Sequence, residues 1–347
     1  MTGAPLAPSA TVGPRRRQLA LRLARAAAAV AGVAVVALLV RSLGPSRIAE
    51  QIGRVRGGFL WMLGAYLAAN VAYAAPLGLV LPRPLRPSPL GLLASRLAAV
   101  AVNASTPFLG VGGEPARLLW MAPGRREAGV TALVIDRSAF LAGSALFLVG
   151  GALASLRIAL PRTAKVAIVS LAALAMALVL ALLALQRRGG VATPVARLLG
   201  LVLRRRRAAL LEHAAAIDAQ VRALHLARPE RLAAAVALHL VGRLLGALEV
   251  LAGARLLGMG VGLEGAYVLA AVPVVVDLVF SMVPSQIGIY EGTNALLASA
   301  LGVDPAAGVA LAFLQRLRQL VFVTLGFALL ALGRPRRFAA DGAEATA

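Results

Sequence analysis

Residues 166–185 read VAIVSLAALAMALVLALLAL, and this uncharged apolar run decides the class of the fold. A helix needs about 20 mostly apolar residues to cross the hydrocarbon core of a bilayer. Similar apolar runs occupy residues 26–40 and 321–332. Of the 347 residues, 60% are hydrophobic, which is more apolar surface than a soluble domain usually carries. The sequence therefore predicts an all-α, polytopic membrane helix bundle.

Outward from that run, the sequence indicates about eight spans. The uninterrupted spans are predicted at residues 20–40, 59–81, 128–155, 164–185, 232–257, 266–283 and 306–332. Two further apolar segments are broken by polar residues, proline and glycine. Residues 90–110 are predicted to enter and leave the membrane on one side, and residues 284–301 count as the eighth span.

The net charge of +22 comes almost entirely from arginine, and most arginines lie in short segments between apolar runs. Arginine in such places orients spans and contacts lipid phosphates, so a nucleic-acid partner is not expected. The positive-inside rule places residues 1–17, 186–231 and 334–347 in the cytoplasm. Residues 1–17 are predicted to be a disordered basic tail and residues 334–347 a short polar tail, flanking a membrane domain at 18–333.

The basic segment 186–231 also carries apolar residues at helical spacing. These are Leu210, Leu211, Ala214, Ile217, Val221 and Leu224. Such a stripe predicts an amphipathic helix that lies on an anionic leaflet.

Several kinds of site are excluded or disfavoured by composition. The chain has no cysteine, and its histidines at 213, 225 and 239 do not cluster in sequence, so no metal site is expected. No Walker-type loop is present, so ATP-driven transport is not indicated. We expect no cofactor, and His239 is interpreted as a polar packing residue.

Two glycine-rich breaks share a pattern. The first reads PFLGVGGE from Pro107 to Glu114, and the second reads PSQIGIYE from Pro284 to Glu291. Proline and glutamate are seven positions apart in both, and the breaks are separated by about 177 residues. The repeat predicts two related halves, at roughly 58–155 and 232–333. Paired broken helices in two halves are typical of a transporter binding site near the membrane midplane.

The breaks also predict a site for an anion. Irregular backbone at membrane depth is tolerated only where protein or a water-filled cavity satisfies its polar groups. A helix that restarts after a glycine-rich break presents free N–H groups suited to phosphate. Asp136, Arg137 and Arg316 lie well inside apolar runs, where charge is costly, whereas Arg96 and Arg255 are interpreted as residues that reach the interface.

The motifs in their order resemble a known family. They are Gly113-Glu114-Pro115-Ala116-Arg117, Asp136-Arg137, Ile287-Gly288, Glu291-Gly292 and Arg316. Together they resemble the lysylphosphatidylglycerol synthase transmembrane-domain family, the flippase-like membrane module of the multiple peptide resistance factor, over residues 20–333. The resemblance implies a bundle of about eight helices in the bacterial plasma membrane that moves a phospholipid between leaflets. The aminoacyl-transferase domain of the fused relatives is not in this sequence, so we do not expect the chain to make lysylphosphatidylglycerol.

The predicted function is translocation of a phospholipid or a lipid-linked precursor. Its headgroup is expected between the two broken helices, with arginines on the phosphate and carboxylates on the arginines or on a cationic headgroup. The predicted headgroup-binding residues are Gly112, Gly113, Glu114, Arg117, Asp136, Arg137, Arg243, Pro284, Gly288, Glu291 and Arg316.

Two alternatives remain open from sequence. The chain could be a membrane-embedded transferase that acts on a polyprenyl phosphate or a phospholipid, with Glu114 or Asp136 as its base. It could also be a non-catalytic scaffold that binds an envelope-biosynthesis enzyme through residues 186–231. An enzyme predicts a changed lipid product, a translocase predicts only changed sidedness, and a scaffold predicts neither without its partner.

Overall fold

The computed structural model describes residues 55–82, 85–106, 112–121, 126–188, 190–202, 204, 207–279 and 289–332, with the single positions 30, 41 and 46. The predicted span at 20–40 and both predicted tails fall almost wholly outside these residues. Within the described part the regular elements are helices, which confirms the all-α prediction. In chain order they are η1 (Arg56–Gly58), α3 (Phe59–Val80), α4 (Pro89–Ser105), α5 (Glu114–Arg117), η3 (Leu118–Trp120), α6 (Arg126–Arg157), α7 (Arg162–Arg188), α8 (Ala192–Val202), α9 (Arg207–Ala227), α10 (Pro229–Leu256), α11 (Leu263–Val279), α12 (Ile289–Ala300) and α13 (Pro305–Leu332).

Five of the described helices are long and apolar enough to cross a membrane, namely α3, α6, α7, α10 and α13. The helices α4 and α11 have 17 residues each and border the two breaks. The chain is therefore a membrane-embedded, multi-pass helix bundle. The count of eight spans and the side on which each terminus lies stay predictions.

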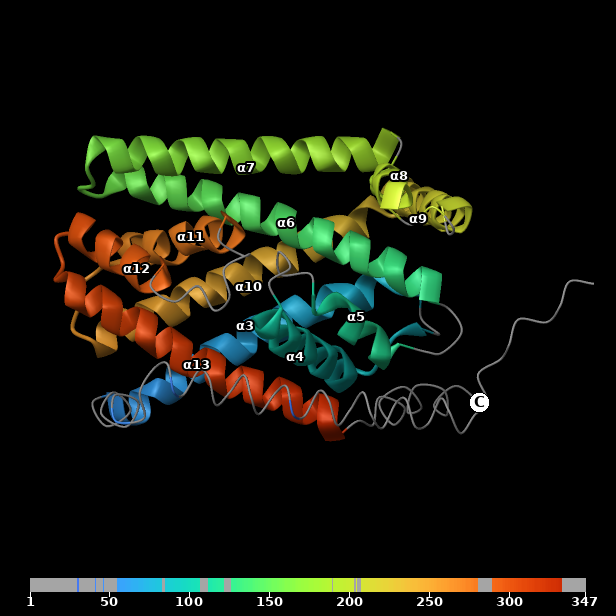
Figure 1. The fold of residues 1–347 in the computed structure, drawn as a ribbon. Helices are drawn as coiled ribbons and strands as arrows, with labels where there is room; N and C mark the ends of the chain where they lie inside the picture. Colours follow the sequence, from blue (N-terminus) through green and yellow to red (C-terminus); the bar gives the residue numbers. More distant parts are fainter. Residues whose placement is uncertain are drawn as a thin grey trace, which may run out of the picture.

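The helices α3 and α10 pack along each other through the middle of the bundle, with α7 on one side and α13 on the other (Figure 1). Glycine permits this close central contact. A Cβ atom at Gly242 of α10 would lie 2.4 Å from the ring of Tyr73 on α3. Small residues at such contacts let membrane helices approach and gain packing energy.

The short helix before each break packs on the long helix after the other break. Thus α4 lies against α13, and α11 lies against α6. A glycine again sits at each contact. A Cβ at Gly326 of α13 would come within 2.2 Å of the Leu97 carbonyl oxygen, and one at Gly150 of α6 within 2.3 Å of the Tyr267 hydroxyl. The stretches α3–α6 and α10–α13 therefore have the same order of elements and pack crosswise.

The predicted amphipathic helix in the basic segment is α9, but its apolar stripe does not face lipid. Val221 is buried, and Ile217 and Leu224 pack with it against Leu77 and Leu133 of the bundle. The stripe therefore attaches α9 to the protein. Three exposed leucines of this segment, Leu198, Leu199 and Leu201, lie on α8, which is beside α9 at one end of α7 (Figure 1).

Candidate functional site

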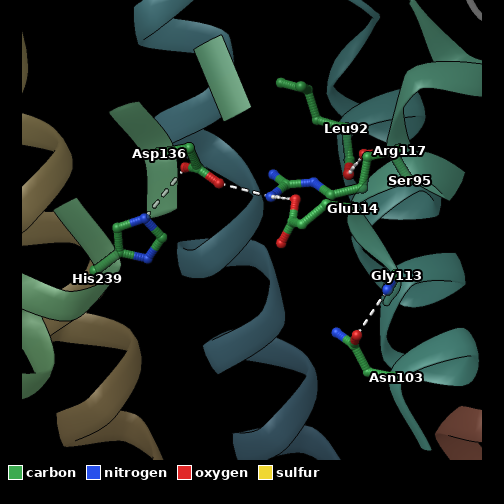
Figure 2. A network of polar contacts seen from close by, with 8 residues as sticks. All are labelled: Leu92, Ser95, Asn103, Gly113, Glu114, Arg117, Asp136 and His239. Carbon is green, nitrogen blue, oxygen red and sulfur yellow. Dashed lines mark hydrogen bonds and ion pairs between the residues drawn. The ribbon is translucent and has the colours of Figure 1, made fainter. Parts of the chain in front are cut away.

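A buried network of charges follows the first break (Figure 2). Arg117 Nη1 donates to Asp136 Oδ2 at 2.6 Å and to Glu114 Oε2 at 3.2 Å. His239 Nε2 lies 3.2 Å from Asp136 Oδ1. The side chains of Arg117 and Asp136 are only 2% and 4% exposed, so this network is closed to solvent. It joins α5 and α6 to α10, and His239 is therefore a partner of Asp136 as well as a packing residue.

The glycines of the first break have a structural explanation. Gly113 donates its backbone N–H to Asn103 Oδ1 at 2.7 Å (Figure 2), and a Cβ there would lie 2.3 Å from the Ala99 carbonyl oxygen. A Cβ at Gly112 would meet Thr106 Oγ1 at 2.1 Å. The amide of Gly113 is thus hydrogen-bonded within the protein, to the side chain of Asn103. Both glycines allow the chain to lie against the end of α4.

The second break is followed by a simpler ion pair. Arg316 on α13 makes two hydrogen bonds to Glu291 on α12, from Nε to Oε1 and from Nη2 to Oε2, the latter at 3.1 Å. Glu291 keeps 24% of its side chain exposed. Pro284 and Gly288, which precede this pair in the predicted site, lie outside the described residues.

Arg137 and Arg243 meet at one aromatic ring. Their guanidinium carbons lie 5.0 and 4.8 Å from the ring centroid of Phe140. Arg243 also donates from Nε to Ser144 Oγ at 3.0 Å. The structure therefore brings together two predicted arginines from α6 and α10, on a ring that itself packs against His239 at 5.4 Å between centroids.

A cavity of about 210 Å³ lies among α3, α4, α6, α10, α11, α12 and α13. The charged residues of its wall come from α4, α10, α11 and α13. They are Arg96, Arg243, Glu249, Asp277 and Arg318. Aromatic residues line it too, and they include three of the four tyrosines of the chain: Tyr66, Tyr73 and Tyr290. Of the predicted headgroup residues that the structure describes, Arg243 is the one that lines this cavity.

Three arginines of the cavity wall stack on aromatic rings. Arg96 lies 5.0 Å from the ring centroid of Tyr73, Arg318 lies 3.9 Å from that of Tyr66, and Arg243 lies over Phe140. A guanidinium that stacks through its face keeps its N–H edge available for a carboxylate or a phosphate. Arg318 uses part of that edge on Glu249. The rings therefore hold three cations in fixed orientations around one space.

Several residues of the wall carry buried polar atoms that lack a hydrogen-bond partner within the described part of the chain. These atoms are Arg96 Nε, Glu249 Oε1, Gln315 Oε1 and Arg318 Nε. A buried polar atom costs free energy unless it is hydrogen-bonded. These atoms are themselves closed to solvent, and they show that the wall of the cavity is polar as well as aromatic.

The sequence-based site list missed Arg96 and Arg318. Arg96 was assigned to the interface, yet it lies beneath Tyr73 on the cavity wall. One signal could have found this surface. Tyr66 and Tyr73 are seven positions apart and share a helix face, which places two polar rings on one side of an otherwise apolar span. Among the described residues no group of three metal-binding side chains occurs.

No curated protein and no solved structure gives a significant match to the chain. The family model described as "Lysylphosphatidylglycerol synthase TM region" matches residues 23–326, which include every described helix of the bundle from α3 through most of α13. Because this match covers most of the sequence, the chain belongs to the lysylphosphatidylglycerol synthase transmembrane-region family.

Proposed function

We propose that the protein translocates a phospholipid or a lipid-linked precursor between the leaflets of the bacterial plasma membrane. The headgroup occupies the cavity between the two stretches α3–α6 and α10–α13, and its phosphate contacts Arg96, Arg243 and Arg318. The observation that carries this proposal is the set of three ring-stacked arginines around a cavity whose wall has buried polar atoms without partners.

The charge of the wall supports an anionic headgroup. Three arginines face two carboxylates, Glu249 and Asp277, across the cavity lining. A phosphodiester with one negative charge would balance the remaining positive charge. Charge at membrane depth is costly unless it is paired or serves a function. A phosphate in the cavity would add a counter-charge for arginines that also contact Glu249 and Ser144 within the bundle.

The cavity wall also supports alternating access. Its residues come from both stretches: Tyr66 and Arg96 from the first, and Arg243 and Arg318 from the second. In our proposal these stretches are related halves, at about 58–155 and 232–333, with residues 186–231 in the cytoplasm between them. Transporters built from two such halves expose a site at their interface to one side and then to the other.

The predicted headgroup residues outside the cavity wall have supporting roles in this proposal. Arg117 and Asp136, with Glu114, hold the first break to α6, and Glu291 with Arg316 holds α12 to α13. Arg137 shares the Phe140 ring with Arg243 and helps to orient it. Pairs of this kind keep the arginines of the wall in place without touching the lipid.

The test is lipid sidedness in proteoliposomes. Purified protein is reconstituted with fluorescent phospholipids, and the fraction that a membrane-impermeant quencher reaches is followed over time. An Arg243→Gln variant loses a charge-assisted contact worth about 1.5–3 kcal/mol, so we expect its translocation rate to fall roughly tenfold or more. The matched control is Arg255→Gln, on the same helix but exposed and away from the cavity.

Two outcomes would overturn the proposal. The first is wild-type protein that moves none of a panel of anionic, zwitterionic and polyprenyl-phosphate lipids. The second is equal rates for Arg243→Gln and Arg255→Gln. A lipid of changed mass after incubation would instead favour a membrane-embedded transferase, so the recovered lipids are also analysed by mass spectrometry.

A further inference from the structure

We infer that α8 is a preformed in-plane anchor, which inserts its leucines into the interface of an anionic leaflet and binds lipid phosphates through the arginines around it. This surface is separate from the cavity, and the inference does not depend on lipid translocation. The occupant is the phospholipid surface itself.

The outer side of α8 is apolar and uncovered. Val195, Leu198, Leu199 and Leu201 are 49%, 68%, 49% and 62% exposed. The helix has 11 residues, too few to cross a bilayer. A short helix with such a face lies in the plane of the interface, with its apolar side at the boundary between headgroups and acyl chains.

The inner side of α8 is made of small residues. Ala196 and Gly200 are buried and one helical turn apart, and α8 packs there on α9. A Cβ at Gly200 would lie 2.8 Å from Cγ of Arg207, the first residue of α9. This close packing leaves the leucines on the side that points away from the protein.

A cap from α9 fixes the start of α8. The carboxylate of Asp218 accepts hydrogen bonds from the backbone N–H groups of Val191, Ala192 and Thr193, at 2.9, 2.8 and 2.8 Å. Burial would raise the pKa of Asp218, but these hydrogen bonds outweigh it and lower the pKa below its ordinary value. The cap is therefore complete at neutral pH and is lost only as the pH falls through that lowered pKa. Most surface anchors fold when they bind, whereas α8 is held as a helix beforehand.

The pair of helices is attached firmly to the bundle. Thr131 on α6 donates to Gln220 on α9 at 2.9 Å, and Val221 is buried against α3 and α6. Since α9 is attached to the bundle, α8 is held close to the ends of the spans. The helix α8 lies beside the end of α7, which is the end of a predicted span (Figure 1).

Positive charge surrounds this surface. Exposed arginines on α7, α8 and α9 and in the link between α8 and α9 are Arg187, Arg188, Arg197, Arg204, Arg207 and Arg222. Glu212 is the exposed acid on the neighbouring face of α9, and Asp218 is buried in the cap. Arginine near an anionic leaflet contributes about 1 kcal/mol per residue at its surface. The charge selects an anionic leaflet over a zwitterionic one.

The absence of cysteine from the sequence makes a site-directed spin-label test direct. Leu198→Cys places a label on the outer face of α8, and Ala219→Cys places one on the exposed side of α9. The protein is reconstituted in phosphatidylcholine vesicles with or without phosphatidylglycerol. Access of oxygen and of a water-soluble nickel complex to each label then reports its depth.

We expect oxygen to reach the label at 198 more readily than nickel does, and the reverse at 219. Adding phosphatidylglycerol is expected to move the label at 198 deeper, and Arg197→Gln with Arg204→Gln is expected to reduce that shift. Equal nickel access at 198 and 219 would overturn the anchor. If the depth of the label at 198 changes neither with phosphatidylglycerol nor with the arginine substitutions, the claim that α8 selects an anionic leaflet is wrong. Neither result bears on the cavity, so failure here and failure of translocation are distinguishable.

Discussion

Glu114 and Glu291 occupy matching positions after the two breaks, yet the protein pairs them in different ways. Glu114 shares Arg117 with Asp136, in a network that also reaches His239 on α10. Glu291 pairs directly with Arg316 on the next helix. The position equivalent to Arg117 in the second stretch is Asn294, whose Nδ2 only donates to the Tyr290 carbonyl oxygen at 2.9 Å.

This difference separates a fixed region from one that adjoins the cavity. The first network is closed, since Arg117 is 1% exposed, and it ties together helices from both stretches. The second pair is partly open, and its sequence neighbours Tyr290 and Gln315 line the cavity. Two breaks with the same sequence pattern can therefore differ in their surroundings, since one is followed by a closed ion-pair network and the other by a pair that borders the cavity.

The largest expected effect is on the closed network. Arg117→Ala removes the cation from the buried carboxylate of Asp136 and from the partly buried carboxylate of Glu114. Breaking one side of a buried pair costs about 3–5 kcal/mol, so we expect the free energy of unfolding in mixed detergent micelles to fall by about that amount. Arg255→Ala, which removes an exposed arginine from α10, serves as the control and should change it little.

A drop of less than about 1 kcal/mol in Arg117→Ala would contradict the assignment of this network to stability. The matching change in the second stretch sharpens the point. Asn294→Ala removes one local hydrogen bond, worth about 1 kcal/mol, and should be far milder than Arg117→Ala.

A smaller effect is expected at the partly open pair. Glu291→Gln removes the charge that Arg316 contacts through two hydrogen bonds, and hydrogen bonds to charged groups are worth about 1.5–3 kcal/mol. We expect the lower part of that range because Glu291 is 24% exposed. A double-mutant cycle with Arg316→Gln measures the coupling. We also expect Glu291→Gln to lower the translocation rate, because its neighbour Tyr290 lines the cavity. Arg117→Lys, in the closed network, should leave the rate near that of the wild type. Equal rates for the two variants would contradict the distinction between the two regions.

The crosswise helix contacts provide a third comparison. Gly326→Ala would force a Cβ against the backbone oxygen of Leu97, whereas Gly150→Ala would meet the side chain of Tyr267. Backbone cannot yield as a side chain can, so we expect Gly326→Ala to destabilise by about 1–3 kcal/mol and Gly150→Ala by less. The measurement is the thermal unfolding temperature of each variant in detergent, and Gly326→Ala should have the lower value. The reverse order would show that the contact of α4 with α13 is the looser one.

The periodicity and length of the apolar runs predicted most of the helices. A long apolar run in a membrane must satisfy its own backbone hydrogen bonds, and the α-helix is the structure that does so within one segment. The predicted span at 59–81 became α3 at Phe59–Val80, and the one at 306–332 became α13 at Pro305–Leu332. The stripe of α9 was assigned to lipid, although it packs on the protein. Periodicity shows that a face is apolar but does not tell whether protein or lipid covers it.

The site was harder to predict for a related reason. A charge inside a span signals either a buried pair or a binding surface, and sequence alone does not separate them. Arg117 pairs internally, while Arg96, which was assigned to the interface, lies on the cavity wall. Whether an arginine is paired internally or lies on the cavity wall depends on contacts with residues distant in the sequence. Arg117 contacts Asp136, and Arg96 contacts Tyr73.

The central claim, that the cavity holds a lipid phosphate headgroup, is tested most directly by the reactivity of a thiol placed inside it. Gly246 lines the cavity, and a Cβ there meets no atom within 4 Å, so Gly246→Cys adds a thiol without a clash. Gly64→Cys on α3 is the matched control, since its Cβ is equally free but lies outside the cavity wall on the exposed side. In proteoliposomes, we expect a charged methanethiosulfonate reagent to modify Gly246→Cys more slowly when a transported lipid is present than when it is absent, with no such difference at Gly64→Cys. Equal modification of Gly246→Cys with every lipid tested, or no modification at all, would contradict the account.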